Sequence, residues 1–140
     1  VLTNGCFDLL HVGHIMLLSA SKKLGDILVV AIDDDASVAK LKGAGRPVIR
    51  ATERSRIISA LDSVDYVVGF SSHQLNELIE TLRPAVLTKG SNYSADHVLG
   101  RDIVERFGGR VEIIPVIEDT SASRIIDKIK NSRTNIRKGG

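Results

Sequence analysis

The chain has 140 residues, of which 43% are hydrophobic and 26% charged, and this is the size and composition of one ordinary globular domain. Its 19 basic and 17 acidic residues give a formal net charge of +2, a balance too even to indicate binding to nucleic acid or to a membrane, and we expect neither partner. A single cysteine, Cys6, excludes an internal disulfide, and no apolar run approaches the roughly 18 residues of a membrane span, so we predict a cytoplasmic protein.

Strand and helix patterns alternate along the chain. The chain opens on Val1 within an expected strand, so we expect native residues before it. The following strands are continuous apolar runs, typical of a parallel sheet covered on both faces. The expected strands are residues 1–3, 27–32, 64–70, 85–88 and 111–117. This alternation predicts an α/β fold, a doubly wound parallel sheet of about five strands with helices on both faces.

Cap and stop signals place the helices between these strands. Ser71 and Gln74 form a capping box before a helix that ends ahead of Pro84. Two more helices are expected, over residues 95–107 and from about Ser121. We expect one domain over residues 1–132 and a flexible basic tail over residues 133–140.

The stretch T-N-G-C-F-D-L-L-H-V-G-H follows the first strand and places two histidines three residues apart. If a helix begins near Val12 or Gly13, His11 and His14 both lie at its N-terminus, where unpaired N–H groups and the helix dipole favour an anion. We interpret this as a phosphate-binding corner in which neutral or charged imidazoles donate hydrogen bonds. Two alternatives stay open from the residues alone: ordinary polar histidines, and a metal site that uses Cys6 and Asp8 with them.

Residues 5–14, G-x-F-D-L-L-H-x-G-H, closely resemble the signature of nucleotidyltransferases that carry H-x-G-H after their first strand. The resemblance implies a Rossmann-like fold and attack of a substrate phosphate or carboxylate on the α-phosphate of a nucleoside triphosphate. Pyrophosphate leaves with the help of Mg2+, for which the protein alone fixes no metal site. His11 and His14 are then expected to contact the triphosphate and the transition state.

The resemblance extends over nearly the whole chain. Lys40 and Lys42 lie in a segment similar to a lysine-bearing loop that folds over the phosphates, and this loop has little apolar content to hold it down. The stretch 46–54 matches the lead into the next helix, where Arg54 is expected to reach the phosphates or an acidic partner such as Asp62 or Asp65. Two later segments, 87–93 and 118–126, resemble the family's K-G-x-D-aromatic segment and its phosphate-binding helix start.

These matches imply three groups of site residues. The expected catalytic residues are His11, His14 and Lys42. The expected nucleotide-binding residues are Thr3, Asn4, Gly5, Phe7, Gly13, Lys89, Gly90, Ser121, Ser123 and Arg124. The expected substrate-binding residues are Asp8, Lys40, Asn92 and Tyr93.

Residues 43–129 look most like the adenylyltransferases that join AMP from ATP to D-glycero-β-D-manno-heptose 1-phosphate for lipopolysaccharide core, often as a domain fused to a kinase. Glycerol-3-phosphate cytidylyltransferase, which uses CTP, is the second possibility, although the Arg-Thr-x-Gly-Ile-Ser run usual there is absent before Ser121. The acidic residue expected after K-G-x is Asn92 here. A non-catalytic nucleotide-binding regulatory domain is the third, because acids cluster at residues 33–35. Family members are commonly dimers, so a homodimer is expected.

Overall fold

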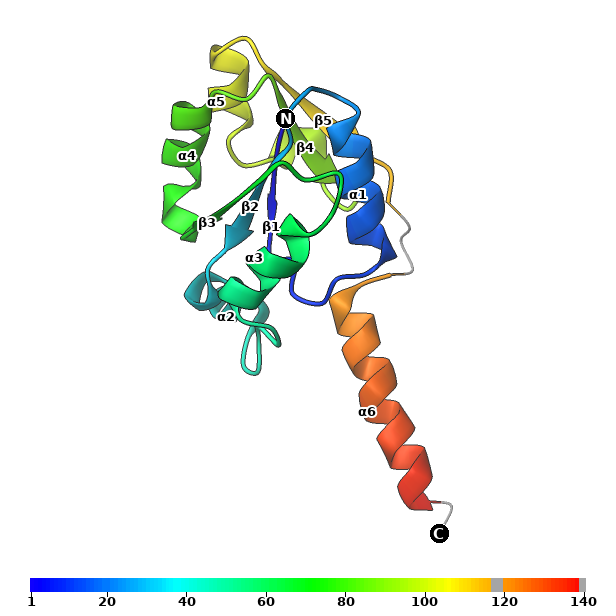
Figure 1. The fold of residues 1–140 in the computed structure, drawn as a ribbon. Coiled ribbons are helices and arrows are strands. Elements are labelled where there is room, and N and C mark those ends of the chain that lie inside the picture. The colour runs from blue at the N-terminus through cyan, green and yellow to red at the C-terminus, as the bar shows by residue number, and fades with distance from the viewer. Residues whose placement is uncertain (117–119, 139–140) are drawn as a thin grey trace.

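Five parallel strands form one sheet in the order β3-β2-β1-β4-β5 (Figure 1). The structure, a computed structural model, describes residues 1–116 and 120–138. The strands are β1 (Leu2–Gly5), β2 (Val29–Asp33), β3 (Tyr66–Phe70), β4 (Val86–Gly90) and β5 (Arg110–Ile114). All four pairings are parallel, which confirms the predicted α/β fold with its Rossmann-like, doubly wound sheet.

The helices divide between the two faces of the sheet. They are α1 (Val12–Lys22), α2 (Asp35–Lys42), α3 (Ala51–Ser59), α4 (Leu75–Leu82), α5 (Arg101–Arg106) and α6 (Ala122–Lys138), with short 3-10 turns at Ser72–Gln74 and Ala95–His97. Leu18 of α1 and Ile58 of α3 pack into one buried cluster, while Ile79 of α4 and Val104 of α5 pack into another. The continuous apolar strands supply both clusters, as strands covered on two faces must.

The order of the strands reverses at β1, which places a ligand site there. Leu2 of β1 pairs with Val29 of β2 on one side and with Leu87 of β4 on the other. In open parallel sheets, ligands bind beyond the carboxyl ends of the strands at such a switch point. The histidine stretch follows the carboxyl end of β1 and therefore lies at this switch point.

Two predictions about helical segments differ from the structure. The expected helix 95–107 is divided, because Gly100 has a φ of +84° and a Cβ there would lie 2.2 Å from Ile79 Cδ1. Lys40 and Lys42 lie in the last turns of α2 rather than in a loop, because Asp34 caps this helix by accepting from Ser37 N at 2.8 Å.

The last helix, α6, runs into the segment expected to be the basic tail. Helix α6 continues to Lys138, so most of the segment expected to be a flexible tail is helical, and residues 139–140 lie outside the described residues. The isoleucines at 125, 129 and 136 keep a helical spacing, and no Gly or Pro interrupts it before residue 139.

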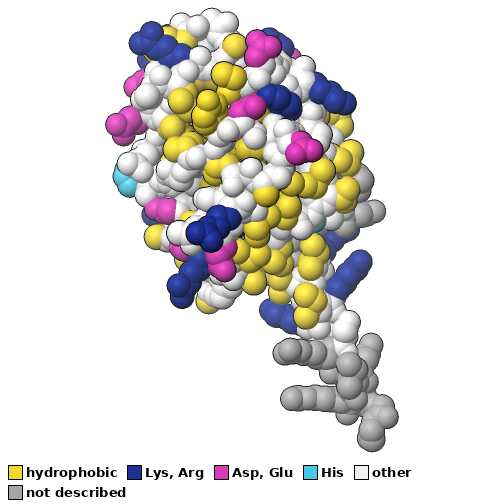
Figure 2. All heavy atoms as spheres, viewed as in Figure 1, with side chains coloured by type: hydrophobic (Ala, Val, Ile, Leu, Met, Phe, Trp, Pro, Cys, Tyr) yellow, Lys and Arg dark blue, Asp and Glu magenta, His cyan; other side chains and the backbone are white. Residues whose placement is uncertain are grey.

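Helix α6 extends away from the rest of the fold (Figure 1). Figure 2 shows hydrophobic side chains gathered on the visible face down to the start of this helix, with Lys and Arg side chains beside it. Exposed apolar residues include Val12 and Met16 of α1 and Ile129 of α6, of which Ile129 is 57% exposed. In the part of the chain that the structure describes, every helix is too short or too polar to cross a membrane.

Candidate active site

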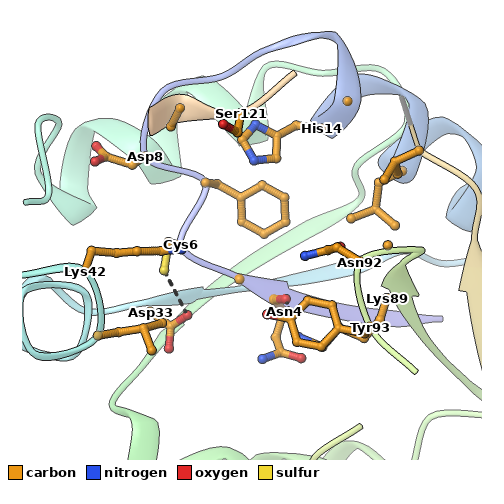
Figure 3. A pocket seen from close by; sticks show the side chains of 18 of the residues that line it. Asn4, Cys6, Asp8, His14, Asp33, Lys42, Lys89, Asn92, Tyr93 and Ser121 are labelled. Atoms are coloured by element: carbon orange, nitrogen blue, oxygen red, sulfur yellow. Dashed lines mark hydrogen bonds between the residues drawn. The ribbon is translucent and has the colours of Figure 1, made fainter. Parts of the chain in front are cut away.

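A cavity of about 740 Å3 opens beyond the carboxyl ends of the strands, a volume suited to small-molecule substrates. Figure 3 shows its lining side chains. Most residues predicted from the sequence meet there: Asn4, Gly5, Phe7, Asp8, His11, Gly13, His14, Lys42, Lys89, Gly90, Asn92, Tyr93, Ser121 and Ser123. Segments far apart in the chain thus converge on one hollow, as the predicted site requires.

Three predicted binding residues lie outside this lining. Thr3 is fully buried in the sheet, where its hydroxyl donates to the Thr88 carbonyl at 3.1 Å. Lys40 is exposed on α2, and Arg124 is exposed on the first turn of α6. The side chain of Thr3 is therefore a structural group of the core rather than a contact for nucleotide.

The two histidines form a stacked pair at the start of α1. Their ring centroids are 3.8 Å apart, and the ring of Phe7 lies 5.2 Å from that of His14. His11 occupies the N-cap position, and its backbone N–H donates to His14 Nδ1 at 3.3 Å. Because Nδ1 of neutral His14 is an acceptor here, its proton must sit on Nε2, which becomes a hydrogen-bond donor.

Burial keeps both imidazoles neutral near pH 7. Desolvation, assisted by the charge of His11, lowers the pKa of His14 to about 4, and desolvation also lowers the pKa of His11. Within the described residues, His11 Nδ1 and Asn4 Oδ1 are the buried side-chain atoms without a hydrogen-bond partner. Orphaned polar atoms in a cavity wall are groups that a ligand or water satisfies.

Gly13 makes room for the histidine pair. A Cβ at this position would lie 3.0 Å from both Cε1 and Nδ1 of His11. A Cβ here would press on the His11 ring and require it to shift by a few tenths of an ångström. The atoms nearest to a side chain at Gly13 would therefore be those of the His11 ring itself.

A second helix begins beside the first. Ser121 caps α6 by accepting from Arg124 N at 3.2 Å, and its hydroxyl lies near His14 in Figure 3. Thr120 O would lie 4.0 Å from a Cβ on Gly13, so the starts of α1 and α6 adjoin. Two helix N-termini at one corner concentrate free N–H groups and positive dipole ends, which favours a polyphosphate.

Asp8 holds the segment between α2 and α3. Its carboxylate accepts from Val48 N and Ile49 N at 2.9 Å and from Arg46 Nε at 2.7 Å. Burial raises the pKa of this carboxyl, but the hydrogen bonds outweigh that effect and leave the pKa lowered. These polar contacts, rather than apolar packing, position the segment, and they engage neither histidine.

Arg54 is a fully buried hub under the same segment. It donates to the carbonyls of Ile49 and Cys6 and to Asp35 Oδ1, the last at 2.8 Å. The expected acidic partners Asp62 and Asp65 were wrong, because Asp35 stands at the start of α2 beside α3. Asp65 instead accepts from Lys22 Nζ and Leu28 N.

Lys89 lies at the end of β4, almost fully buried. Its ammonium donates to the Asn4 carbonyl at 2.8 Å and sits 5.1 Å from the centre of the Tyr93 ring. Desolvation lowers the pKa of Lys89 to about 8, although the nearby Asp33 acts to raise it. The ammonium therefore remains mostly charged near pH 7 inside a half-apolar wall.

The alternative left open by the sequence, a metal site that uses Cys6 and Asp8 with the histidines, finds little support in the geometry of the described residues. Burial raises the pKa of the Cys6 thiol, which donates weakly to Asp33 Oδ2 at 3.8 Å, so a nucleophilic thiolate is disfavoured. Among residues 1–116 and 120–138, three or more His, Cys, Asp or Glu side chains never gather closely enough to hold a metal ion.

Sequence reasoning missed one wall of the cavity. Asp33, Ser37, Phe70, Ser72 and Leu75 line it from β2, α2, β3 and the segment leading into α4. The acidic run at 33–35 is a usable signal for this wall, although by itself it favours a regulatory domain as much as a substrate site. Phe70 and Leu75 carry no signal beyond ordinary core residues.

Comparison with known proteins identifies the family. The cytidylyltransferase-like family model matches residues 2–138, and the chain belongs to this family. The bifunctional protein HldE of Desulfatibacillum aliphaticivorans is 59% identical over 133 residues, covering 95% of this chain and 27% of the relative. The HldE protein of Citrifermentans bemidjiense is 54% identical over 132 residues, 94% and 27% of the two chains. The chain thus spans about a quarter of the length of these relatives.

Solved structures agree with the family assignment. The crystal structure of a lipopolysaccharide core biosynthesis protein from Thermoplasma volcanium superposes with a TM-score of 0.69 at 28% identity, over 85% of this chain and 96% of that one. Pantothenate synthetase from Thermus thermophilus shares the fold alone, with a TM-score of 0.54 at 15% identity over 82% and 54% of the chains. The predicted family is confirmed, and with it the class of enzyme, a nucleotidyltransferase.

Proposed function

We propose that the chain transfers AMP from ATP to the phosphate of a sugar phosphate, D-glycero-β-D-manno-heptose 1-phosphate, and releases pyrophosphate. The observation that carries this proposal is the stacked pair His11–His14 at the point where the N-termini of α1 and α6 adjoin. The similarity of the whole chain to HldE proteins and to the Thermoplasma lipopolysaccharide core biosynthesis protein supports the choice of acceptor.

The reaction joins an acceptor phosphate oxygen to the α-phosphorus while the bond from that phosphorus to the oxygen that bridges it to the β-phosphorus breaks, and this oxygen leaves with pyrophosphate. Negative charge grows on the leaving oxygen and on the oxygens around phosphorus. The neutral His14, held by the His11 N–H, offers its Nε2–H there without surrendering a proton. Lys42 lines the cavity and adds a positive charge for the phosphates. Catalysis is thus proposed to rest on positioning and fixed charge.

Mg2+ is proposed to enter with the nucleotide, held by phosphate oxygens and water. The donor set of the cavity fits this arrangement, because both oxygens of Asp8 already accept hydrogen bonds from the 46–49 segment, and the second acid of the lining, Asp33, offers a single carboxylate. The ion would neutralise charge on the triphosphate. The protein's own part is to position the phosphates with helix N-termini, imidazoles and Lys42.

Pyrophosphate release tests the proposal directly. ATP or CTP is paired with heptose 1-phosphate or glycerol 3-phosphate in the presence of Mg2+, with magnesium omitted in a parallel reaction. We expect release with ATP and the heptose phosphate. Release with CTP and glycerol 3-phosphate would show that these, and not ATP and the heptose phosphate, are the substrates. Nucleotide binding without pyrophosphate release from any pair would indicate the regulatory alternative.

We also propose a homodimer that works in the cytoplasm, where ATP is supplied. Helix α6 projects from the fold with Ile129 exposed, and a second copy would cover that apolar side chain (Figure 1). Light scattering should give twice the chain mass, and Ile129→Glu should lower it. A monomeric wild-type chain at micromolar concentration would refute the dimer.

A further inference from the structure

The cavity has two sides, divided by β1. On one side lie Asp33, the last residue of β2, and residues that follow this strand, among them Ser37 and Lys42. On the other lie residues that follow β4, among them Asn92 and Tyr93. Figure 3 shows the same division, with Asp33 beside Cys6 and Lys42, and with Asn92 and Tyr93 across Asn4 from them. The Lys89 ammonium lies between the two sides, because it donates to the Asn4 carbonyl and is within electrostatic reach of Asp33. A reaction between two substrates needs room for one on each side of the reacting phosphorus.

Asp33 is the cavity's uncommitted carboxylate. The cavity lining within residues 1–116 and 120–138 contains two acids, Asp8 and Asp33, and the loop hydrogen bonds engage both oxygens of Asp8. The neighbours of Asp33 in the acidic run are also engaged: Asp34 caps α2, and Asp35 holds Ala51 N and Arg54. Within residues 1–116 and 120–138, Asp33 Oδ2 accepts the weak thiol hydrogen bond of Cys6, and the carboxylate lies within electrostatic reach of Lys89 and Arg54 without a hydrogen bond to either, which leaves Oδ1 for a ligand or water.

We propose that Asp33 is a specificity residue for the acceptor, whose carboxylate accepts hydrogen bonds from hydroxyl groups of a phosphorylated polyol or sugar. This inference rests on the proposed nucleotidyltransferase function and extends it. Hydroxyl groups donate readily to a carboxylate, whereas a phosphate placed there would be repelled by like charge. Asp33 therefore selects the uncharged, hydroxyl-bearing part of the acceptor.

The position of Asp33 favours the acceptor over the nucleotide. The triphosphate is expected at the starts of α1 and α6, and α6 follows β5 in the chain. Because β4 and β5 lie together on the other side of β1, the nucleoside is expected to continue along them. The β2 side, with Asp33, Ser37 and Phe70, then remains for the acceptor.

The negative charge is also displaced relative to the family pattern. The K-G-x-D resemblance leads one to expect an acid at position 92, where this chain has Asn92. Asn92 lines the β4 side, so this substitution leaves that side without the carboxylate, and the free carboxylate of the cavity stands on β2. A recognition role explains why Asp33 is kept half-buried although desolvation raises its pKa and so opposes folding.

The test measures the two substrate KM values separately for wild type, Asp33→Asn and the matched control Asp62→Asn, an exposed acid outside the cavity. Asp33→Asn keeps the shape and removes the charge. We expect its KM for heptose 1-phosphate, or for glycerol 3-phosphate if that is the acceptor used, to rise at least about fivefold, because a hydrogen bond to a charged group exceeds a neutral one by about that factor. Its KM for ATP should stay within about twofold, and Asp62→Asn should change neither.

Monodeoxy analogues of the acceptor identify the hydroxyl. For at least one analogue, the missing hydroxyl should lower the wild-type kcat/KM by at least about fivefold relative to the full acceptor. The same analogue should lower the kcat/KM of Asp33→Asn only slightly relative to the full acceptor. Urea unfolding should show Asp33→Asn to be as stable as wild type or more so. Should Asp33→Asn fail to fold, Asp33→Ser takes its place in both comparisons.

A rise in the KM for ATP with an unchanged acceptor KM would overturn the inference and assign Asp33 to the nucleotide base. Unchanged values for both substrates would overturn it as well. These results leave the proposed function intact, since wild type still releases pyrophosphate. If wild type releases none with any acceptor, the proposed function fails, and calorimetric binding of heptose 1-phosphate to wild type and Asp33→Asn decides the role of Asp33: tighter or equal binding by the variant refutes it.

Discussion

Replacing His14 by alanine removes the donor on which the proposed catalysis rests. The imidazole is stacked on His11 at 3.8 Å and oriented by the His11 N–H at 3.3 Å, so its Nε2–H is fixed before substrate arrives. Alanine offers no donor and leaves space that water fills. Water in that space must reorient as charge develops, which the fixed imidazole need not do.

The size of the effect follows from this preorganisation. Loss of one oriented donor in an active site lowers turnover by about 10²- to 10³-fold, or about 2.7–4 kcal/mol of transition-state stabilisation. His14 Nδ1 also satisfies an N–H at the helix start, whose loss lowers the free energy of unfolding by about 1 kcal/mol. The variant should therefore stay folded, and its loss of transition-state stabilisation should exceed its loss in the free energy of unfolding.

The assay is pyrophosphate release at saturating ATP and acceptor, with His73→Ala as the control, because His73 is exposed and outside the cavity. Since the pKa of His14 is about 4, the ring is neutral above pH 6, and kcat should show no limb due to this residue between pH 6 and 8. A folded His14→Ala protein with kcat within fivefold of wild type would refute the reasoning.

Three other changes test the surrounding structure. Gly13→Ala should lower kcat about tenfold or more by displacing the His11 ring, while urea unfolding shows equal or greater stability, because alanine favours a helix by up to about 1 kcal/mol; lost stability with normal kcat would contradict this. Arg54→Met should lower the free energy of unfolding by about 3–5 kcal/mol, against little change for the exposed control Arg56→Met, because it leaves buried partners unpaired. Between pH 6.5 and 4 the unfolded chain binds a proton that folded His14 does not. The free energy of unfolding, measured by urea titration, should therefore fall by about 3 kcal/mol as the pH is lowered through this range. An equal fall in His14→Gln would exclude His14 as the cause.

The sequence predicts the sheet and the histidine corner because both depend on local order. Continuous apolar runs such as residues 27–32 need two covered faces, which a parallel sheet with helices on both sides supplies. The three-residue spacing of His11 and His14 matches the N-cap and third positions of a helix, so a correct helix start fixes both rings at one end. Neither inference requires knowledge of distant residues.

The missed features depend on distant partners. Arg54 is paired with Asp35 rather than Asp62 or Asp65, which lie nearer in sequence, and only the packing of α2 against α3 decides among them. Gly100 divides a helical pattern because Ile79, on another helix, occupies the space of its Cβ. A helical or acidic pattern does not encode such a neighbour.

The acidic run at 33–35 shows why composition alone cannot assign roles. Three identical side chains follow one strand, yet each faces a different structure because the backbone turns from β2 into α2. Asp34 turns to Ser37 and Ser71, Asp35 to α3, and Asp33 to the cavity. A regulatory acid cluster would need these carboxylates to converge, and here they diverge.

The segment after β1 joins the loop and the histidines into one unit. Asp8 holds the amides of Val48 and Ile49, and the carbonyl of Cys6 accepts from Arg54, while the same segment ends in the histidine pair. A change in the loop between α2 and α3 therefore acts on the turn from which His11 and His14 project. The residues that hold this loop are polar and buried, so its position is specified by hydrogen-bond geometry rather than by apolar area. Substrate phosphates that contact Lys42 on α2 and the histidines on α1 would then bind to two elements whose spacing is already set.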